Sequence, residues 1–167
     1  ALPLVALPLV VLPLVVAVAA AIVARRDRDP VRDRLEHVAA GERVADLGAA
    51  PGGWTWAAAR RGARVWAVDN GPLKQGAAGH PAVEHVKADA FAWRPPVRAD
   101  WLLCDIVDDP RHVLELLRHW CREHWCRRIV ANFKYGRADP LALLAAVRGP
   151  RGLAPFTPEL VCRHLFH

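Results

Sequence analysis

The residues best suited to chemistry lie together between positions 46 and 56, in the order DLGAAPGGWTW. This stretch is typical of the end of a buried strand, a glycine-rich turn and the start of a helix. Parallel α/β sheets bind nucleotide-like ligands at such strand-turn-helix units. Gly48, Gly52 and Gly53 let the backbone approach a ligand closely, and Pro51 stiffens the turn. The glycine spacing differs from the dinucleotide fingerprint GxGxxG. The alternative is an ordinary strand-to-helix turn.

Acidic residues follow the predicted strands and suggest what the ligand is. Asp46 ends the first strand, and a carboxylate there suits an ammonium or sulfonium group better than phosphates, so we expect S-adenosylmethionine (SAM). Asp69 lies 21 residues after Gly48, where an acidic side chain meets a ribose diol. Asp89 follows the third strand, where it can accept from the adenine amine. Each of these residues alone could instead be a cap or loop residue.

Lys134 stands out because the chain has 20 Arg and only three Lys. Lysine can release its proton in a protein, whereas arginine cannot. A ribose hydroxyl is a poor nucleophile until it is deprotonated, and a sulfonium beside the amine favours proton release from the lysine. We therefore expect Lys134 to act as the base, with Asp105 on a neighbouring strand orienting it. The alternative for Lys134 is a solvated loop residue.

The elements that must position these residues alternate between short apolar strands and helices. Strands are predicted over residues 43–47, 64–68, 83–86, 101–104, 128–133 and 159–166. Helices are predicted over residues 31–39, 54–61, 110–125 and 140–147. This alternation predicts a Rossmann-like α/β fold, with a mostly parallel open sheet and helices on both faces.

Composition divides the chain into three regions. Residues 1–24 form an apolar low-complexity extension with a proline every five residues, residues 25–42 a charged linker with a short helix, and residues 43–167 the α/β domain. The extension is long enough to cross a bilayer, but its prolines interrupt helical hydrogen bonding. We favour an irregular extension, with membrane contact through residues 1–24 as the alternative.

Charge and cysteine content bear on partners and location. The net charge of +6 comes from residues 111–167, which carry ten basic and four acidic residues. This excess predicts an anionic partner, against the alternative of a solubilising surface. The four cysteines form no CxxC pair, and the soft ligands of the run from His119 to Cys126 would spread around a helix. We therefore expect a cytoplasmic protein without a metal site.

The stretch from Asp46 to Thr55 resembles the SAM motif of the FtsJ-like ribose 2'-O-methyltransferases. Residues 68–73, 104–107, 125–127 and 132–134 narrow the resemblance to members that modify a cytidine ribose in large-subunit ribosomal RNA. The resemblance implies Lys134 as the proton acceptor and SAM contacts from Ala50, Pro51, Gly52, Gly53, Asp69, Asp89 and Asp105. Asp46, Gly48 and Trp54 of the same motif complete the expected cofactor residues.

The chain departs from the family pattern in its catalytic set. The family uses a Lys-Asp-Lys-Glu tetrad, but no lysine precedes Lys74 here, and the closing Glu is expected beyond residue 167. The family's amino-terminal RNA-binding region and last strand are also expected to be missing, so residues 159–166 should pair outside the family pattern or pack poorly. Three hypotheses follow: an RNA ribose methyltransferase, a SAM-binding but catalytically weak RNA-binding fragment, and another SAM or nucleotide enzyme on this fold.

Overall fold

The computed structural model describes residues 18–19, 34–74, 76–134, 136, 138–157, 159–162 and 164–165. The predicted extension over residues 1–24 lies outside these residues except for β1 (Val18–Ala19), as does the predicted linker before residue 34. Within the described part of the chain, no helix is long and apolar enough to cross a membrane.

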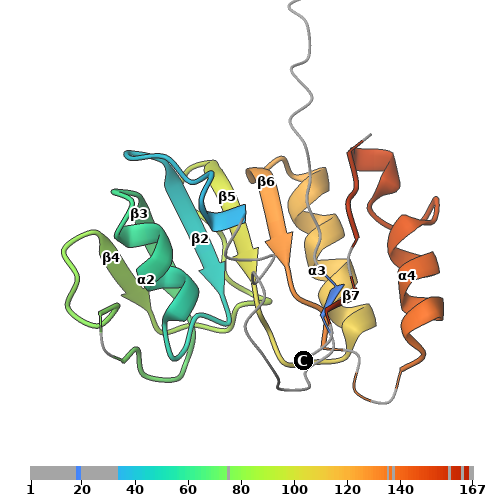
Figure 1. Ribbon diagram of the computed structural model, residues 1–167, viewed down its shortest axis with the longest axis horizontal. Coiled ribbons are helices and arrows are strands. Elements are labelled where there is room, and N and C mark those ends of the chain that lie inside the picture. Colours follow the sequence, from blue (N-terminus) through green and yellow to red (C-terminus); the bar gives the residue numbers. More distant parts are fainter. Residues whose placement is uncertain are drawn as a thin grey trace, which may run out of the picture.

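Five parallel strands form the central sheet, in the order β4-β3-β2-β5-β6 (Figure 1). They are β2 (Arg43–Leu47), β3 (Arg64–Val68), β4 (Val83–Val86), β5 (Ala99–Cys104) and β6 (Cys126–Ala131). Because all five run in the same direction, their carboxyl ends meet at one edge of the sheet, as the sequence predicts for a Rossmann-like fold.

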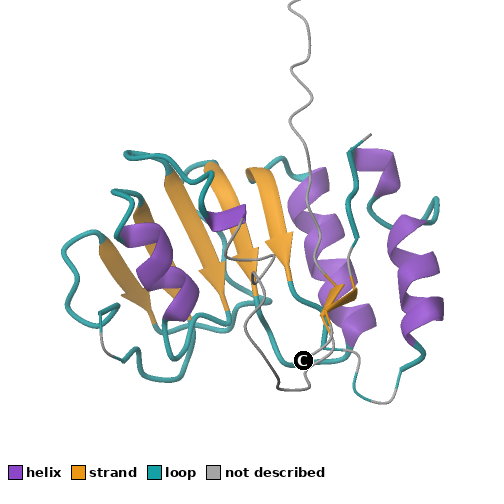
Figure 2. Cartoon of the chain, viewed as in Figure 1, coloured by secondary structure: helices purple, strands orange, loops and turns teal. Residues whose placement is uncertain are grey.

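Helices cover both faces of this sheet (Figure 2). One face packs on α2 (Gly53–Ala59), and the other on α3 (Pro110–Arg122), beside which lies α4 (Pro140–Arg148). The alternation of side chains along β2 shows how both faces become core, since Val44 packs with the α2 cluster and Ala45 with the α3 cluster.

Helix α3 begins where the sequence predicts and ends earlier. The Asp109 side chain caps it by accepting a hydrogen bond from the backbone N–H of Arg111, and Pro110 occupies its first turn. His124 then takes a left-handed φ of 52°, and the backbone N–H of Trp125 donates to the carbonyl of Trp120. This local closure ends the helix before the predicted position 125.

Strands β5 and β6 begin two residues earlier in the chain than the sequence predicts. They begin at Ala99 and Cys126 rather than at the predicted residues 101 and 128. The prediction left Asp100 and Arg127 outside these strands, but the two side chains pair with each other at 3.5 Å and both residues lie within β5 and β6. The predicted end of β6 at residue 133 is likewise wrong, so Lys134 follows the strand by three residues.

Two predicted elements are much shorter in the structure. The strand predicted over residues 159–166 is reduced, in its described part, to an isolated bridge at Val161 and to β7 (His164–Leu165). β7 pairs with β1 outside the main sheet, after a 3₁₀ turn, η1 (Ala154–Phe156). The hydroxyl of Thr157 accepts from the N–H of Glu159, a local bond that competes with strand pairing.

The helix predicted over residues 31–39 is helical only at residues 34–35 within the described part, and residues 36–37 form a turn. The backbone N–H of Ala39 donates to the Glu42 carboxylate at 2.8 Å instead of continuing a helix. This side-chain acceptor satisfies the backbone locally, which explains the early end of the helical turn.

Candidate active site

The glycine loop between β2 and α2 contains two positions at which the fold itself leaves no room for a side chain. Gly48 has a φ of 75°, and a Cβ added there would lie 3.0 Å from the backbone nitrogen of Ile106. Gly52 has a φ of 111°, and a Cβ there would lie 2.6 Å from the Cβ of Ala77. Both positions exclude a side chain through backbone conformation and through close packing.

Gly53 differs from these two glycines. A Cβ added at this position would meet nothing within 4 Å, and its φ is not in the left-handed region. Packing among the described residues therefore does not require a glycine there, and the open space at the start of α2 fits the close approach of a ligand. The half-buried Trp54 follows directly, and Pro51 precedes through a cis peptide bond with Ala50.

Asp46 is the penultimate residue of β2, and its carboxylate is buried, with the residue 1% exposed. Its Oδ2 accepts from the Thr55 hydroxyl at 2.6 Å, and its Oδ1 has no hydrogen-bond partner among the described residues. The pKa of Asp46 is raised to about 7, mainly by burial; the hydrogen bonds from Thr55 lower it, and the nearby carboxylates of Asp105 and Asp69 contribute to the increase. A buried acceptor without a partner suits a ligand that brings a donor or a positive charge.

Asp69 and Asp89 both bind backbone groups in the structure. Asp69 accepts from the N–H of Ala50 at 2.9 Å through Oδ2 and from the N–H of Gly71 at 2.7 Å through Oδ1. It therefore braces the glycine loop. Asp89 is exposed and accepts from the N–H of Phe91 at 2.9 Å. Contacts of these two carboxylates with a ribose and an adenine remain predictions, and each oxygen has a second lone pair for such a contact.

The structure brings the predicted catalytic pair together. The backbone N–H of Asp105 donates to the carbonyl of Leu47, which places Asp105 beside the glycine loop. Lys134 Nζ lies 2.5 Å from Asp105 Oδ1, with side chains 25% and 35% exposed. The amide of Asn132 donates to the same oxygen at 2.8 Å. One carboxylate oxygen therefore holds both a potential base and a neutral amide.

Asn132 is a site residue that the sequence analysis did not select. It is 7% exposed, and its backbone N–H donates to the carbonyl of Cys104, which aligns it with the end of β5. Its Oδ1 has no partner among the described residues, as is true of Asp46 Oδ1. Its position just after β6 and two residues before Lys134 is the signal that could have identified it.

Two other features bear on ligands. A cavity of about 660 Å³ runs along α2 past Gly53 and Trp54, but neither Asp105 nor Lys134 lines it, so the strand ends rather than this cavity define the site. Within the described residues, no group of three or more His, Cys, Asp or Glu could hold a metal ion. Cys104 is a buried free thiol, and burial raises its pKa to about 12.

Comparison with known proteins agrees with this geometry. The chain is 50% identical over 101 residues to ribosomal RNA large subunit methyltransferase M of Halorhodospira halophila, covering 60% of this chain and 30% of that protein. It is 50% identical over 94 residues to the Xylella fastidiosa protein of the same name, covering 56% and 27%. The chain thus matches less than a third of the length of these relatives.

Among solved structures, the crystal structure of 23S rRNA methyltransferase ErmE matches with a TM-score of 0.49 and 23% identity, over 72% of this chain and 55% of that one. The family model described as FtsJ-like methyltransferase matches residues 31–128, which include the glycine loop, Asp105 and four strands of the sheet. The chain therefore belongs to the FtsJ-like methyltransferase family.

Proposed function

We propose that this chain binds SAM at the carboxyl edge of the sheet and directs its methyl group to a ribose 2'-hydroxyl of large-subunit ribosomal RNA, on a cytidine. The observation that carries the proposal is the contact of Lys134 with Asp105, next to the glycine loop. It places a lysine that can exchange a proton beside a loop suited to a cationic cofactor. The names of the relatives support ribosomal RNA as the substrate.

The residues present fit SAM as the cofactor. The open space at Gly53 admits a ligand against the backbone, and the buried Oδ1 of Asp46 can accept from an ammonium group. Asp69 holds the loop in place through Ala50. When bound, SAM supplies an electrophilic methyl group on a positively charged sulfur.

The side chains around Lys134 would position the amine that takes up the proton of the 2'-hydroxyl. Asp105 fixes the direction of the Lys134 amine, and Asn132 fixes Asp105 by donating to the same oxygen. In its neutral form, Lys134 Nζ would accept the proton of the 2'-hydroxyl, whose oxygen is the proposed methyl acceptor. Positioning of the two reactants supplies most of the acceleration.

The test is methyl transfer by the Lys134→Ala variant, measured with labelled SAM and ribosomal RNA from cells that lack the modification. We expect transfer to fall by about 10²- to 10⁴-fold, the usual loss for a general base. Calorimetry should show unchanged SAM binding. The matched control is Lys87→Ala, an exposed lysine after β4, which should transfer at the wild-type rate.

Wild-type transfer by Lys134→Ala would remove Lys134 from the base role. Failure of the folded wild-type protein to bind SAM at about 100 μM, a weak affinity for a cofactor, would contradict the choice of SAM. A second candidate function, a SAM-binding and catalytically weak RNA-binding protein, is favoured by the absence of any lysine before Lys74 in this sequence. It predicts binding of both SAM and RNA without transfer.

A further inference from the structure

The connection from β4 to β5, residues 87–98, contains no helix. No helix of this connection therefore covers the amino ends of the strands on the sheet face that α3 covers elsewhere, and Trp93 packs against Trp66 on that face. A cavity of about 710 Å³ lies there, and its lining includes Arg43, Arg64, Trp66, Glu84 and Val97. It lies at the opposite ends of the strands from Lys134, so the proposed methyl transfer does not use it.

Two arginines lie opposite each other on neighbouring strands in this cavity. Arg43 and Arg64 are register partners on the neighbouring parallel strands β2 and β3, and both line the cavity. Adjacent strands lie about 4.8 Å apart, and like charges directly opposite each other on one face of a sheet are destabilising. An anion between the two guanidinium groups would relieve that repulsion.

The carboxylates nearby do not fully balance these arginines. Asp100 lies 3.8 Å from Arg43 and 3.5 Å from Arg127, so one carboxylate serves two guanidinium groups. Arg64 is exposed and forms no ion pair with any described residue, and neither does Glu84. Arg64 and Glu84 therefore both line the cavity without an ion-pair partner among the described residues, and the lining carries two arginines against one carboxylate.

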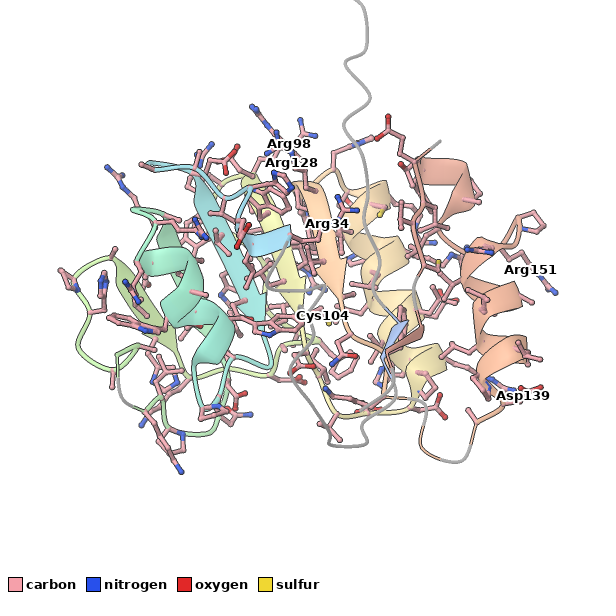
Figure 3. All side chains as sticks on the ribbon, in the orientation of Figure 1. Arg34, Arg98, Cys104, Arg128, Asp139 and Arg151 are labelled. Atoms are coloured by element: carbon pink, nitrogen blue, oxygen red, sulfur yellow. The ribbon has the colours of Figure 1, made fainter. Side chains whose placement is uncertain are left out.

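More positive charge and an apolar surface adjoin this cavity. The exposed Arg98 follows the lining residue Val97 in the chain, and Figure 3 shows Arg98 at the amino edge of the sheet. The half-buried indole of Trp66 and the 47% exposed Val97 supply apolar lining. Arginines with an aromatic surface bind the phosphates and bases of single-stranded RNA, whereas an acidic peptide has no need of the indole.

We propose that this cavity binds a segment of the substrate RNA remote from the methylated ribose, with Arg43 and Arg64 on its phosphates. The choice of RNA rests on the proposed function. β3 is five residues long and spans about 16 Å, so an RNA that reaches from Lys134 to Arg64 must be longer than one nucleotide.

The experiment measures binding of a labelled large-subunit ribosomal RNA fragment to the full chain by fluorescence anisotropy at several salt concentrations. For Arg64→Ala we expect weaker binding and a slope of log K against log salt that falls by about one, as for the loss of one phosphate contact. Arg64→Lys should restore most of the slope. SAM binding by calorimetry should not change.

The matched control is Arg148→Ala, which removes the same charge from an exposed position in the last turn of α4. It should keep the wild-type slope. If Arg64→Ala and Arg148→Ala behave alike, the cavity does not bind RNA. If Arg64→Ala loses binding of polyglutamate but keeps its RNA affinity, the partner is an acidic protein and the inference is wrong. Arg64-dependent RNA binding without methyl transfer by the wild type would count against the proposed function alone.

Discussion

The two edges of the sheet carry opposite charge although the same strands form both. At the carboxyl edge, four carboxylates lie at or just after strand ends, namely Asp46, Asp69, Asp89 and Asp105, together with Lys87 and Lys134. At the amino edge arginines outnumber acids, with Arg43, Arg64, Arg98, Arg127 and Arg128 beside Glu42, Glu84 and Asp100. The proposed cationic cofactor and the proposed RNA segment would therefore meet complementary charge at different ends of one sheet.

The two edges also differ in how deeply their polar groups are buried. Asp46 and Asn132 are 1% and 7% exposed, so changes there act in a poorly solvated environment. The arginine pairs of the amino edge are partly exposed, with Arg43 at 39% and Arg127 at 47%. Such pairs contribute about 1 kcal/mol or less each, because water and salt screen them. Equivalent changes should therefore have larger effects at the carboxyl edge.

The largest expected effect on stability is the pH dependence caused by Asp46. Its pKa of about 7 in the folded protein lies above the ordinary 3.8, so between these values the unfolded chain is ionised while the native carboxyl stays protonated. Stability therefore falls as pH rises through this window, by up to about 4 kcal/mol, and levels off above pH 7. Urea unfolding at several pH values measures this loss, which Asp46→Asn should remove.

The control is Asp139→Asn at the exposed amino end of α4, where asparagine caps as well as aspartate and the wild-type pH profile should persist. An Asp46→Asn protein whose stability relative to wild type is the same at pH 4 and pH 8 would show that Asp46 does not titrate near neutral pH.

The second expected effect separates the glycines of the carboxyl edge. Gly48→Ala places a Cβ against the backbone of Ile106 at a positive φ, which should cost about 2–4 kcal/mol of unfolding free energy. Gly53→Ala meets open space in the first turn of α2 and should leave the protein as stable or slightly more stable, but it should weaken SAM binding. Chemical denaturation and calorimetry on both variants make the comparison.

Gly53→Ala with wild-type SAM affinity would mean that the ligand does not approach this part of the loop. Equal stability losses in both variants would contradict the distinction between a glycine required for packing and one available to a ligand.

The smallest expected effect lies at the amino edge. Glu42 accepts from Trp101 Nε1 at 2.7 Å and from Arg128 at 2.9 Å. Glu42→Gln replaces an ion pair with a neutral contact and should cost about 1 kcal/mol of unfolding free energy. Removal of an acid should also strengthen RNA binding if the amino edge contacts RNA, which anisotropy would detect. Unchanged RNA affinity would limit the contact to the cavity around Arg64.

Much of the scaffold was predictable from local pattern. The bounds of β2, β3 and β4 match the predicted ones, and the ends of these strands placed Asp46, Asp69 and Asp89 at one edge. Strand ends converge in any parallel sheet, so the contact of Asp105 with Lys134 needed only the neighbouring positions of β5 and β6.

The features that were missed depend on contacts between distant residues. Asn132 becomes a site residue because β6 ends at Ala131 and its amide then reaches Asp105. The pairing of Arg43 with Arg64 depends on strand register, which apolar periodicity does not specify for the charged first residue of a strand. The pairing of β7 with β1 joins segments that have no local signal in common.

The close approach of Gly48 to Ile106 joins two parts of the site mechanically. Because Ile106 follows Asp105 directly, a displacement of the glycine loop also displaces the carboxylate that holds Lys134. Under the proposed function, occupancy of the loop by SAM and the position of Lys134 would be thermodynamically linked. By reciprocity, RNA bound at Lys134 would change the affinity for SAM by the same factor as SAM changes the affinity for RNA.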